Sequence, residues 1–201
     1  STLAPFATDM YLPVFPAMAL DLDVSASVIQ LSLTTFFLGV AAGQLVLGPV
    51  SDRVGRKPPL LIGSILCLLA SMVAAMAPTA EVLLGARLVQ GFTGAAGIVI
   101  ARAIVADLYQ GVIAAKMFSL LAMVGGVAPV VAPVLGGLLA GPVGWRGILW
   151  TLTGVTALML VAVIFVIEET HGPAVRARAG HGPTGPGMTG LMKRPGYLAN
   201  A

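Results

Sequence analysis

Gly48-Pro49-Val50-Ser51-Asp52-Arg53-Val54-Gly55-Arg56-Lys57 is a short charged stretch that separates two long apolar runs of the sequence. It carries four charged side chains within ten residues. Lysine and arginine are retained in this way in the cytoplasmic loops between membrane helices. The stretch therefore predicts a cytoplasmic hairpin between two transmembrane helices.

The composition supports a membrane protein. Of the 201 residues, 58% are hydrophobic and 9% are charged, and the mean hydropathy is +0.99, whereas soluble domains carry about 25% charged residues. Apolar segments long enough to cross a hydrocarbon core about 30 Å thick cover residues 3–20, 28–49, 59–77, 81–106, 117–140 and 146–167. We expect an all-α, polytopic membrane protein with a bundle of six transmembrane helices over residues 1–167.

The rest of the chain has a different composition. Residues 168–194 are rich in Gly, Pro and Arg, which predicts a flexible basic cytoplasmic linker. Residues 195–201 look like the start of a further, truncated segment. His171 and His181 are the only histidines and lie in the linker away from Cys67, the only cysteine. We therefore expect no metal site.

The distribution of charge predicts an orientation. The net charge is +3, but the cations lie in short loops rather than along one soluble face, which argues against nucleic-acid binding. One side receives nearly all of the Lys and Arg residues, namely Arg53, Arg56, Lys57, Arg102, Lys116, Arg176, Arg178, Lys193 and Arg194. The positive-inside rule then places both ends of the bundle in the cytoplasm. On the opposite side, Trp145 and Trp150 are predicted to anchor the chain in the membrane interface.

Two charged residues fall inside the predicted spans. Asp9 lies about twelve residues, or roughly 18 Å, from the outer end of the first helix, and Arg87 about 10 Å from the outer end of the fourth. A charge at the bilayer centre costs about 2.5–3.5 kcal/mol on insertion scales, so such residues are functional candidates. We expect electrostatic coupling between them. The alternative for Arg87 is a structural link to helix-end carbonyls or Gln90.

Glycine spacing predicts close packing between helices. Gly39 and Gly43, and Gly137 and Gly141, are spaced i, i+4, which allows helix backbones to approach in a membrane. The glycines between residues 91 and 97 lie in the middle of a predicted span with no strand before them, so they also predict packing rather than a phosphate loop.

Four motifs give the chain a resemblance to a known family. Gly48 to Lys57 fits G-x-L-x-D-R-x-G-R-[KR], with Val50 in place of leucine. The pattern L-x-x-x-R-x-x-Q-G is matched by Leu83, Arg87, Gln90 and Gly91, and a first-helix signature by residues 8–13 with Pro16. A fifth-helix pattern, G-x-x-x-G-P-x-x-G-G, is also matched, with Ala128 and Ala132 in place of its first two glycines. The other matching residues are Pro133, Gly136 and Gly137. The chain thus resembles the N-terminal six-helix half of a major facilitator superfamily transporter, of the bicyclomycin-resistance type of drug:proton antiporter.

This resemblance implies a fold and a mechanism. The fold is an inverted three-plus-three repeat, and the similar stretches 48–55 and 141–147 fit it on opposite membrane faces. The function implied is export of a small drug-like molecule from a bacterial inner membrane by alternating access, together with a missing C-terminal six-helix half. The proton gradient supplies the energy and no cofactor is expected. Asp9 and Arg87 would couple protons, so that protons and drug use Asp9 alternately.

Further residues receive roles from the resemblance. A cytoplasmic gating loop would use Gly48, Asp52, Arg53, Gly55, Arg56 and Asp107, with Arg53 or Arg56 engaging the acid on the fourth helix. The alternative for this loop is a topology anchor alone. The fifth helix would kink at Pro129 and Pro133, near Gly136 and Gly137. Tyr11, Gln90 and Met123 are candidates for lining the substrate cavity.

Two other functions are compatible with a multi-pass membrane chain. A metabolite or sugar symporter of the same superfamily would lack the match at residues 8–13 and the proline pattern of the fifth helix. A membrane-embedded lipid-modifying enzyme would need acids or histidines clustered at an interface. The eight acidic residues are scattered along the chain, so we expect a transporter rather than an enzyme.

Overall fold

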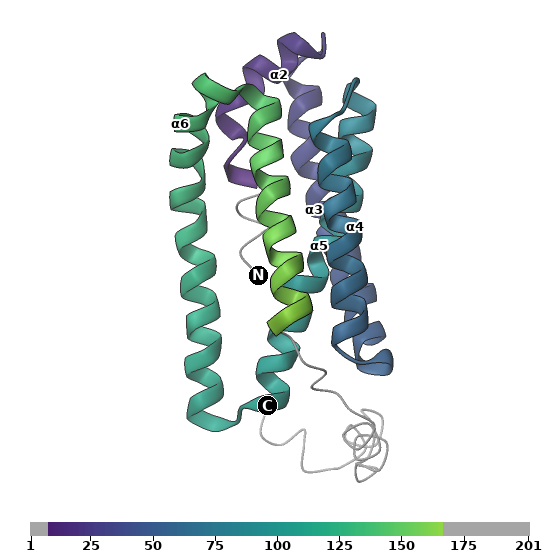
Figure 1. Cartoon of the computed structure of the whole chain (residues 1–201), viewed down its shortest axis with the longest axis vertical. Helices are drawn as coiled ribbons and strands as arrows, with labels where there is room; N and C mark the ends of the chain where they lie inside the picture. The colour runs from purple at the N-terminus through teal and green to yellow at the C-terminus, as the bar shows by residue number, and fades with distance from the viewer. Residues whose placement is uncertain (1–7, 167–201) are drawn as a thin grey trace, which may run out of the picture. The chain divides into compact units, whose positions relative to one another are not determined.

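The computed structural model describes residues 8–166, and over this range the chain is helical with no β-strand. The elements (Figure 1) are the 3-10 helix η1 and five α-helices: η1 Leu12–Val14, α2 Phe15–Asp21, α3 Ala26–Val54, α4 Lys57–Ala75, α5 Ala80–Leu108 and α6 Gly111–Val166. The predictions for residues 168–201, including the linker and both histidines, lie outside the described residues. Four of these helices are long and apolar enough to cross a membrane.

The sequence predicts that the charged stretch is a loop, but part of it is helical in the structure. Helix α3 runs on through Asp52 and Arg53 to Val54, and only Gly55 and Arg56 connect it to α4. Gly55 has φ 103°, a conformation that side chains with a Cβ rarely adopt. Hydropathy marks where an apolar segment ends, but the helix continues into the polar phase because its backbone hydrogen bonds are satisfied there as well.

Helices α3 and α5 pack against each other at backbone distance. A Cβ atom built on Gly39 would overlap the carbonyl oxygen of Leu88, and one on Gly91 would overlap that of Phe36. Small residues permit this approach where packing must replace the hydrophobic effect. The pair Gly137 and Gly141 behaves differently from the prediction, since a Cβ at either would meet no atom within 4 Å in this structure.

Helix α6 folds back on itself. Its 56 residues would extend about 84 Å if straight, at 1.5 Å per residue, which far exceeds a hydrocarbon core of about 30 Å. The chain reverses at Gly144, which has φ 64° and ψ −176°, and Figure 1 shows the two antiparallel arms. The reversal falls at the predicted break, although the first arm begins at Gly111 rather than at residue 117. A count of six spans stays a prediction.

The first apolar segment is not the continuous helix predicted for residues 3–20. Thr8 and Asp9 are helical, Met10 and Tyr11 are not, and η1 and α2 follow. Proline explains the break, because Pro13 has no N–H group for the carbonyl of Asp9, four residues earlier. The N–H of Val14 turns instead to the carbonyl of Tyr11, at 3.1 Å.

A polar cluster connects α2 to α6 at the end of the bundle that holds α2. Arg146 forms an ion pair with Asp21, and the Trp145 indole N–H donates to the same carboxylate at 3.3 Å. The Arg146 guanidinium lies 4.2 Å from the centre of the Trp145 ring. Trp145 is buried, so its predicted role as an interfacial anchor is wrong. Its N–H finds a protein carboxylate instead of interfacial water.

Candidate functional site

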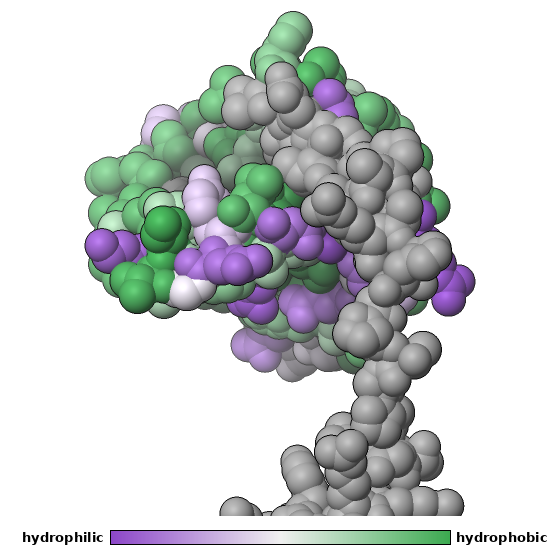
Figure 2. All heavy atoms as spheres, turned by 90° about the horizontal axis from the view of Figure 1, so that it is seen from below, coloured by the Kyte–Doolittle hydropathy of each residue, from purple (hydrophilic) through white to green (hydrophobic). Residues whose placement is uncertain are grey.

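Besides the cluster of Asp21, Trp145 and Arg146, the described residues form a polar network at the α3–α4 connection and another inside the bundle. The loop network consists of Ser51, Asp52, Arg56 and Asp107, and the buried network of Tyr11, Ser32, Ser71, Arg87 and Gln90. Figure 2 views the end of the bundle that holds the loop network, and hydrophilic residues gather on it between apolar ones.

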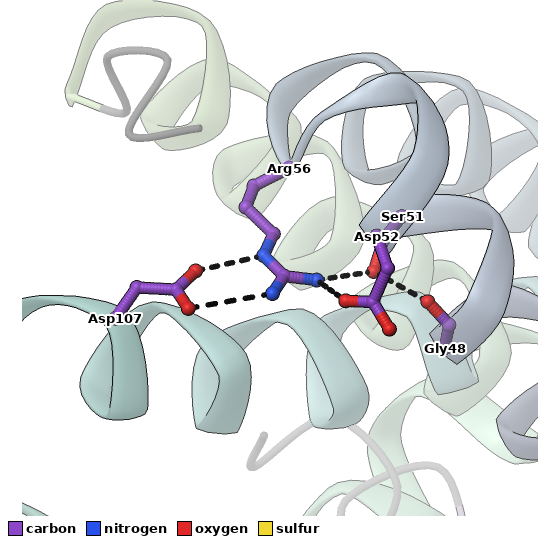
Figure 3. A network of polar contacts seen from close by, with 5 residues as sticks. All are labelled: Gly48, Ser51, Asp52, Arg56 and Asp107. Carbon is purple, nitrogen blue, oxygen red and sulfur yellow. Dashed lines mark hydrogen bonds and ion pairs between the residues drawn. The ribbon is translucent and has the colours of Figure 1, made fainter. Parts of the chain in front are cut away.

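The loop network converges on Arg56. The turn at Gly55 places this residue at the start of α4, where it points across to Asp107 in the last turn of α5 (Figure 3). The Arg56 Nε donates to Asp107 Oδ2 at 2.9 Å, and Nη2 to Oδ1 at 3.5 Å. Arg56 Nη1 donates to Asp52 Oδ1 at 2.5 Å. A single guanidinium thus ties the ends of α3 and α5 together.

Ser51 completes this arrangement from α3. Its Oγ donates to the carbonyl of Gly48 at 2.9 Å and accepts a hydrogen bond from Arg56 Nη1 at 2.8 Å. Ser51 was not singled out from the sequence, because it occupies a variable position of the motif. A Cβ at Gly48 would lie 3.7 Å from Val99, an ordinary contact. Gly48 therefore contributes its carbonyl group to the network, and the structure shows no steric reason for glycine at this position.

The loop network is sheltered unequally from water. The side chain of Arg56 is 7% exposed, that of Asp107 24% and that of Asp52 64%. Burial by itself lowers the pKa of Arg56, but hydrogen bonds to Asp107 and Asp52 outweigh burial and raise it above its usual value. The sequence left Arg53 and Arg56 as alternatives for engaging the acid on the fourth helix. In the structure Arg56 makes this contact, and Arg53 is exposed.

The buried network surrounds Arg87, whose side chain is fully buried. Its Nη1 donates to Gln90 Oε1 at 2.9 Å, and Gln90 Nε2 donates in turn to Ser71 Oγ on α4 at 2.7 Å. Gln90 sits one turn after Arg87 on α5, where i and i+3 side chains meet. The contact with Gln90 is the structural role that the sequence offers as the alternative for Arg87, and the bond from Gln90 to Ser71 links α5 to α4.

Tyr11 lies on the other side of Arg87. The centre of its ring is 4.0 Å from the guanidinium carbon, and its hydroxyl is 2.7 Å from Ser32 Oγ on α3. Ser32 donates its own proton to the carbonyl of Ile29 at 2.5 Å, so the Tyr11 hydroxyl acts as donor to Ser32. The sequence does not predict that Ser32 and Ser71 belong to this network, because a serine in a helix more often bonds only to its own backbone.

The remaining predicted residues occupy separate positions. The Asp9 carboxylate is partly buried and accepts a hydrogen bond from Thr8 at 3.1 Å, while its coupling to Arg87 stays a prediction. Tyr11 and Gln90 are buried, whereas Met123 is 61% exposed. Pro129 and Pro133 lie inside the first arm of α6. Among residues 8–166, no group of three His, Cys, Asp or Glu residues could hold a metal ion.

Comparisons with known proteins agree on one family. The model of the Major Facilitator Superfamily matches residues 1–199. The MFS-type transporter YdgK of Bacillus subtilis is 41% identical over 201 residues, which are 99% of this chain and 50% of YdgK. A bicyclomycin resistance protein homolog of Haemophilus influenzae is 40% identical over 171 residues, covering 85% of this chain and 43% of that protein. The chain spans about half the length of these relatives.

A solved structure supports the fold. The human organic anion transporter MFSD10 matches with a TM-score of 0.64 over 84% of this chain and 45% of its own. The sequences are 21% identical, so this likeness concerns the fold alone.

Proposed function

This chain belongs to the major facilitator superfamily, and we propose that it forms the first half of a proton-coupled exporter of small drug-like molecules. It is a multi-pass membrane protein of a transporter family rather than of an enzyme family. The name of the Haemophilus influenzae relative supports a drug-like substrate. We place the transporter in the bacterial inner membrane with both ends of this half in the cytoplasm, on the basis of the charge distribution.

One observation carries the coupling part of this proposal. A fully buried arginine lies in the bundle, and its guanidinium faces the non-helical turn that directly follows Asp9. Ionisable residues inside membrane segments mark ion and proton pathways, and discontinuous helices line the binding sites of many transporters. Asp9 would exchange protons and substrate alternately, and the missing second half would supply the other wall of the cavity.

The loop network fits the same cycle as a gate. Arg56 holds the ends of α3 and α5 together through Asp52 and Asp107. These contacts would stabilise one of the two states of alternating access. We propose that opening toward the cytoplasm weakens them.

The test is uphill export by the complete transporter in inverted vesicles. Asp9→Asn should abolish export driven by a proton gradient, whereas Asp23→Asn, which alters an exposed acid, should leave it intact. Collapse of the gradient should stop export in the wild type. Normal proton-dependent export by Asp9→Asn would remove Asp9 from the mechanism, and proton-driven uptake in the opposite direction would favour a metabolite symporter.

A further inference from the structure

The break in the first helix has little support from its own backbone. Pro13 and Pro16 carry no N–H groups, and the N–H groups of Val14 and Phe15 turn to the carbonyls of Tyr11 and Leu12 in 3-10 geometry. In a continuous α-helix the N–H of Val14 would bond to the carbonyl of Met10. Non-helical backbone at membrane depth is tolerated where other parts of the protein enclose it. Contacts with other helices must therefore set the position of this turn.

Tyr11 is the residue through which the bundle holds the turn on one side. Its side chain is fully buried. Its ring lies under the guanidinium of Arg87 on α5 at 4.0 Å, and its hydroxyl donates to Ser32 on α3 at 2.7 Å. The ring also lies 5.0 Å from that of Phe15, in α2. Contacts of one side chain with α2, α3 and α5 fix both the depth and the rotation of the turn.

The first arm of α6 closes the opposite side. A Cβ atom built on Gly136 would overlap the carbonyl oxygen of Met10. The backbone of the turn thus lies directly against α6 at the residue that precedes Tyr11. At Gly137, the next residue along, a Cβ would meet no atom within 4 Å. Only one of these two adjacent glycines is required by contact with the turn.

We propose that Tyr11 is a positioning residue: clamped between Arg87 and Ser32, it fixes the broken turn and thereby the place of the Asp9 carboxyl group two residues earlier. This inference rests on the proposed function for its transport readout, because Asp9 matters there as a coupling residue. It departs from a cavity-lining role for Tyr11. A ring fully enclosed by protein and stacked on Arg87 orients the site without contacting the substrate.

The first measurement reads the position of residue 9 without transport. The complete transporter is prepared without other cysteines, with Asp9→Cys and with Cys67→Ser, and it is labelled with a water-soluble maleimide. Adding Tyr11→Leu should raise the labelling rate at position 9 at least about tenfold, because a desolvated cation–π contact is lost along with the hydrogen bond. Tyr11→Phe keeps the ring over Arg87 and loses only the bond to Ser32, so it should raise the rate by a smaller factor, about threefold. The control Tyr109→Leu, at the partly exposed end of α5, should not change it.

The second measurement uses Asp9 intact and follows drug export. Tyr11→Leu should lower the maximal rate roughly 30-fold and change KM less than about threefold, and Tyr11→Phe should restore at least half of the rate. If Tyr11→Leu does not fold, Gly136→Ala displaces the turn from the other side. It should raise labelling at position 9, whereas Gly137→Ala should not.

These outcomes separate the alternatives. A raised KM with an unchanged maximal rate and unchanged labelling would make Tyr11 a substrate contact and overturn the proposal. Unchanged labelling in both Tyr11→Leu and Gly136→Ala would also overturn it. A wild type that shows no proton-driven export, together with the labelling changes, would refute the proposed function while supporting the clamp on the turn.

Discussion

The contact between Arg56 and Asp107 makes a quantitative prediction. Replacing Arg56 by Gln and Asp107 by Asn, singly and together, gives a double-mutant cycle whose coupling free energy isolates the pair. The bond at 2.9 Å is charge-assisted, and bonds to charged groups contribute about 1.5–3 kcal/mol. The second bond, at 3.5 Å, adds little. Because the Asp107 side chain is 24% exposed, we take the lower part of that range and expect about 1.5–2 kcal/mol.

The same reasoning gives a much smaller value for the other carboxylate. The Asp52 side chain is 64% exposed, and exposed ion pairs are worth about 0.2–1 kcal/mol. The coupling of Arg56 to Asp52 should therefore stay below about 0.5 kcal/mol despite the shorter distance. Burial, rather than separation, decides the order of the two pairs.

The assay is the free energy of unfolding of the complete transporter in mild detergent, measured by steric trapping for each member of the cycle. Arg53→Gln is the matched control, since it removes an exposed arginine from the last turn of α3, and it should change stability by less than about 0.5 kcal/mol. The reasoning is refuted if the coupling between Arg56 and Asp107 falls below that of Arg56 with Asp52. It is also refuted if Arg53→Gln destabilises as much as Arg56→Gln.

Gly91→Ala should destabilise the folded protein by at least about 2 kcal/mol, because the added Cβ would overlap the backbone carbonyl of Phe36. Gly97→Ala is the control and should not destabilise it, because a Cβ there meets no atom within 4 Å. Equal melting temperatures of the two variants would contradict this prediction. Burial lowers the pKa of Arg56, but its hydrogen bonds to Asp107 and Asp52 outweigh burial and raise this pKa above its usual value. The stabilising effect of Arg56 is therefore complete below the pKa of the unfolded chain and is lost only as the pH rises through the higher folded value. The melting-temperature difference between Arg56→Gln and wild type should stay constant from pH 7 to 10, and a narrowing difference would refute this assignment. Asp52→Asn should reduce export sharply and leave membrane insertion intact, because we expect the exposed Asp52 carboxylate to face a helix end of the missing second half; its weak pair with Arg56 would not have this effect. Unchanged export would leave the loop as a topology anchor.

Much of the architecture was accessible from the sequence because it follows from hydropathy and turn chemistry. The apolar runs predict α4 and α5 to within a few residues. The glycine at position 144 lies in the predicted turn and has the left-handed φ angle that reverses α6. The family resemblance also implies an arginine of the charged stretch close to Asp107, and the fold selects Arg56 for this contact.

Other features depend on contacts that periodicity does not encode. Prolines at positions 13 and 16 signal a disturbed helix, but whether a kink or a full break results depends on neighbours such as Tyr11 and Gly136. Tryptophan is a residue type that often anchors a chain in the membrane interface, which is why the sequence predicts this role for Trp145. In the structure the carboxylate of Asp21 in α2 lies beside it, and Trp145 is a buried hydrogen-bond donor instead. Ser32 and Ser71 become members of the buried network because of the residues that face them from other helices.

The broken first segment has a consequence for how the chain is made. Its apolar helix Leu12–Asp21 is shorter than the described helices that could cross a membrane, and its support comes from α3, α5 and Gly136, which are synthesised later. Alone in lipid, the turn would expose carbonyl groups that nothing satisfies. We therefore expect this segment to reach its final position only after α3, α5 and the first arm of α6, all of which follow it in the chain, have entered the membrane.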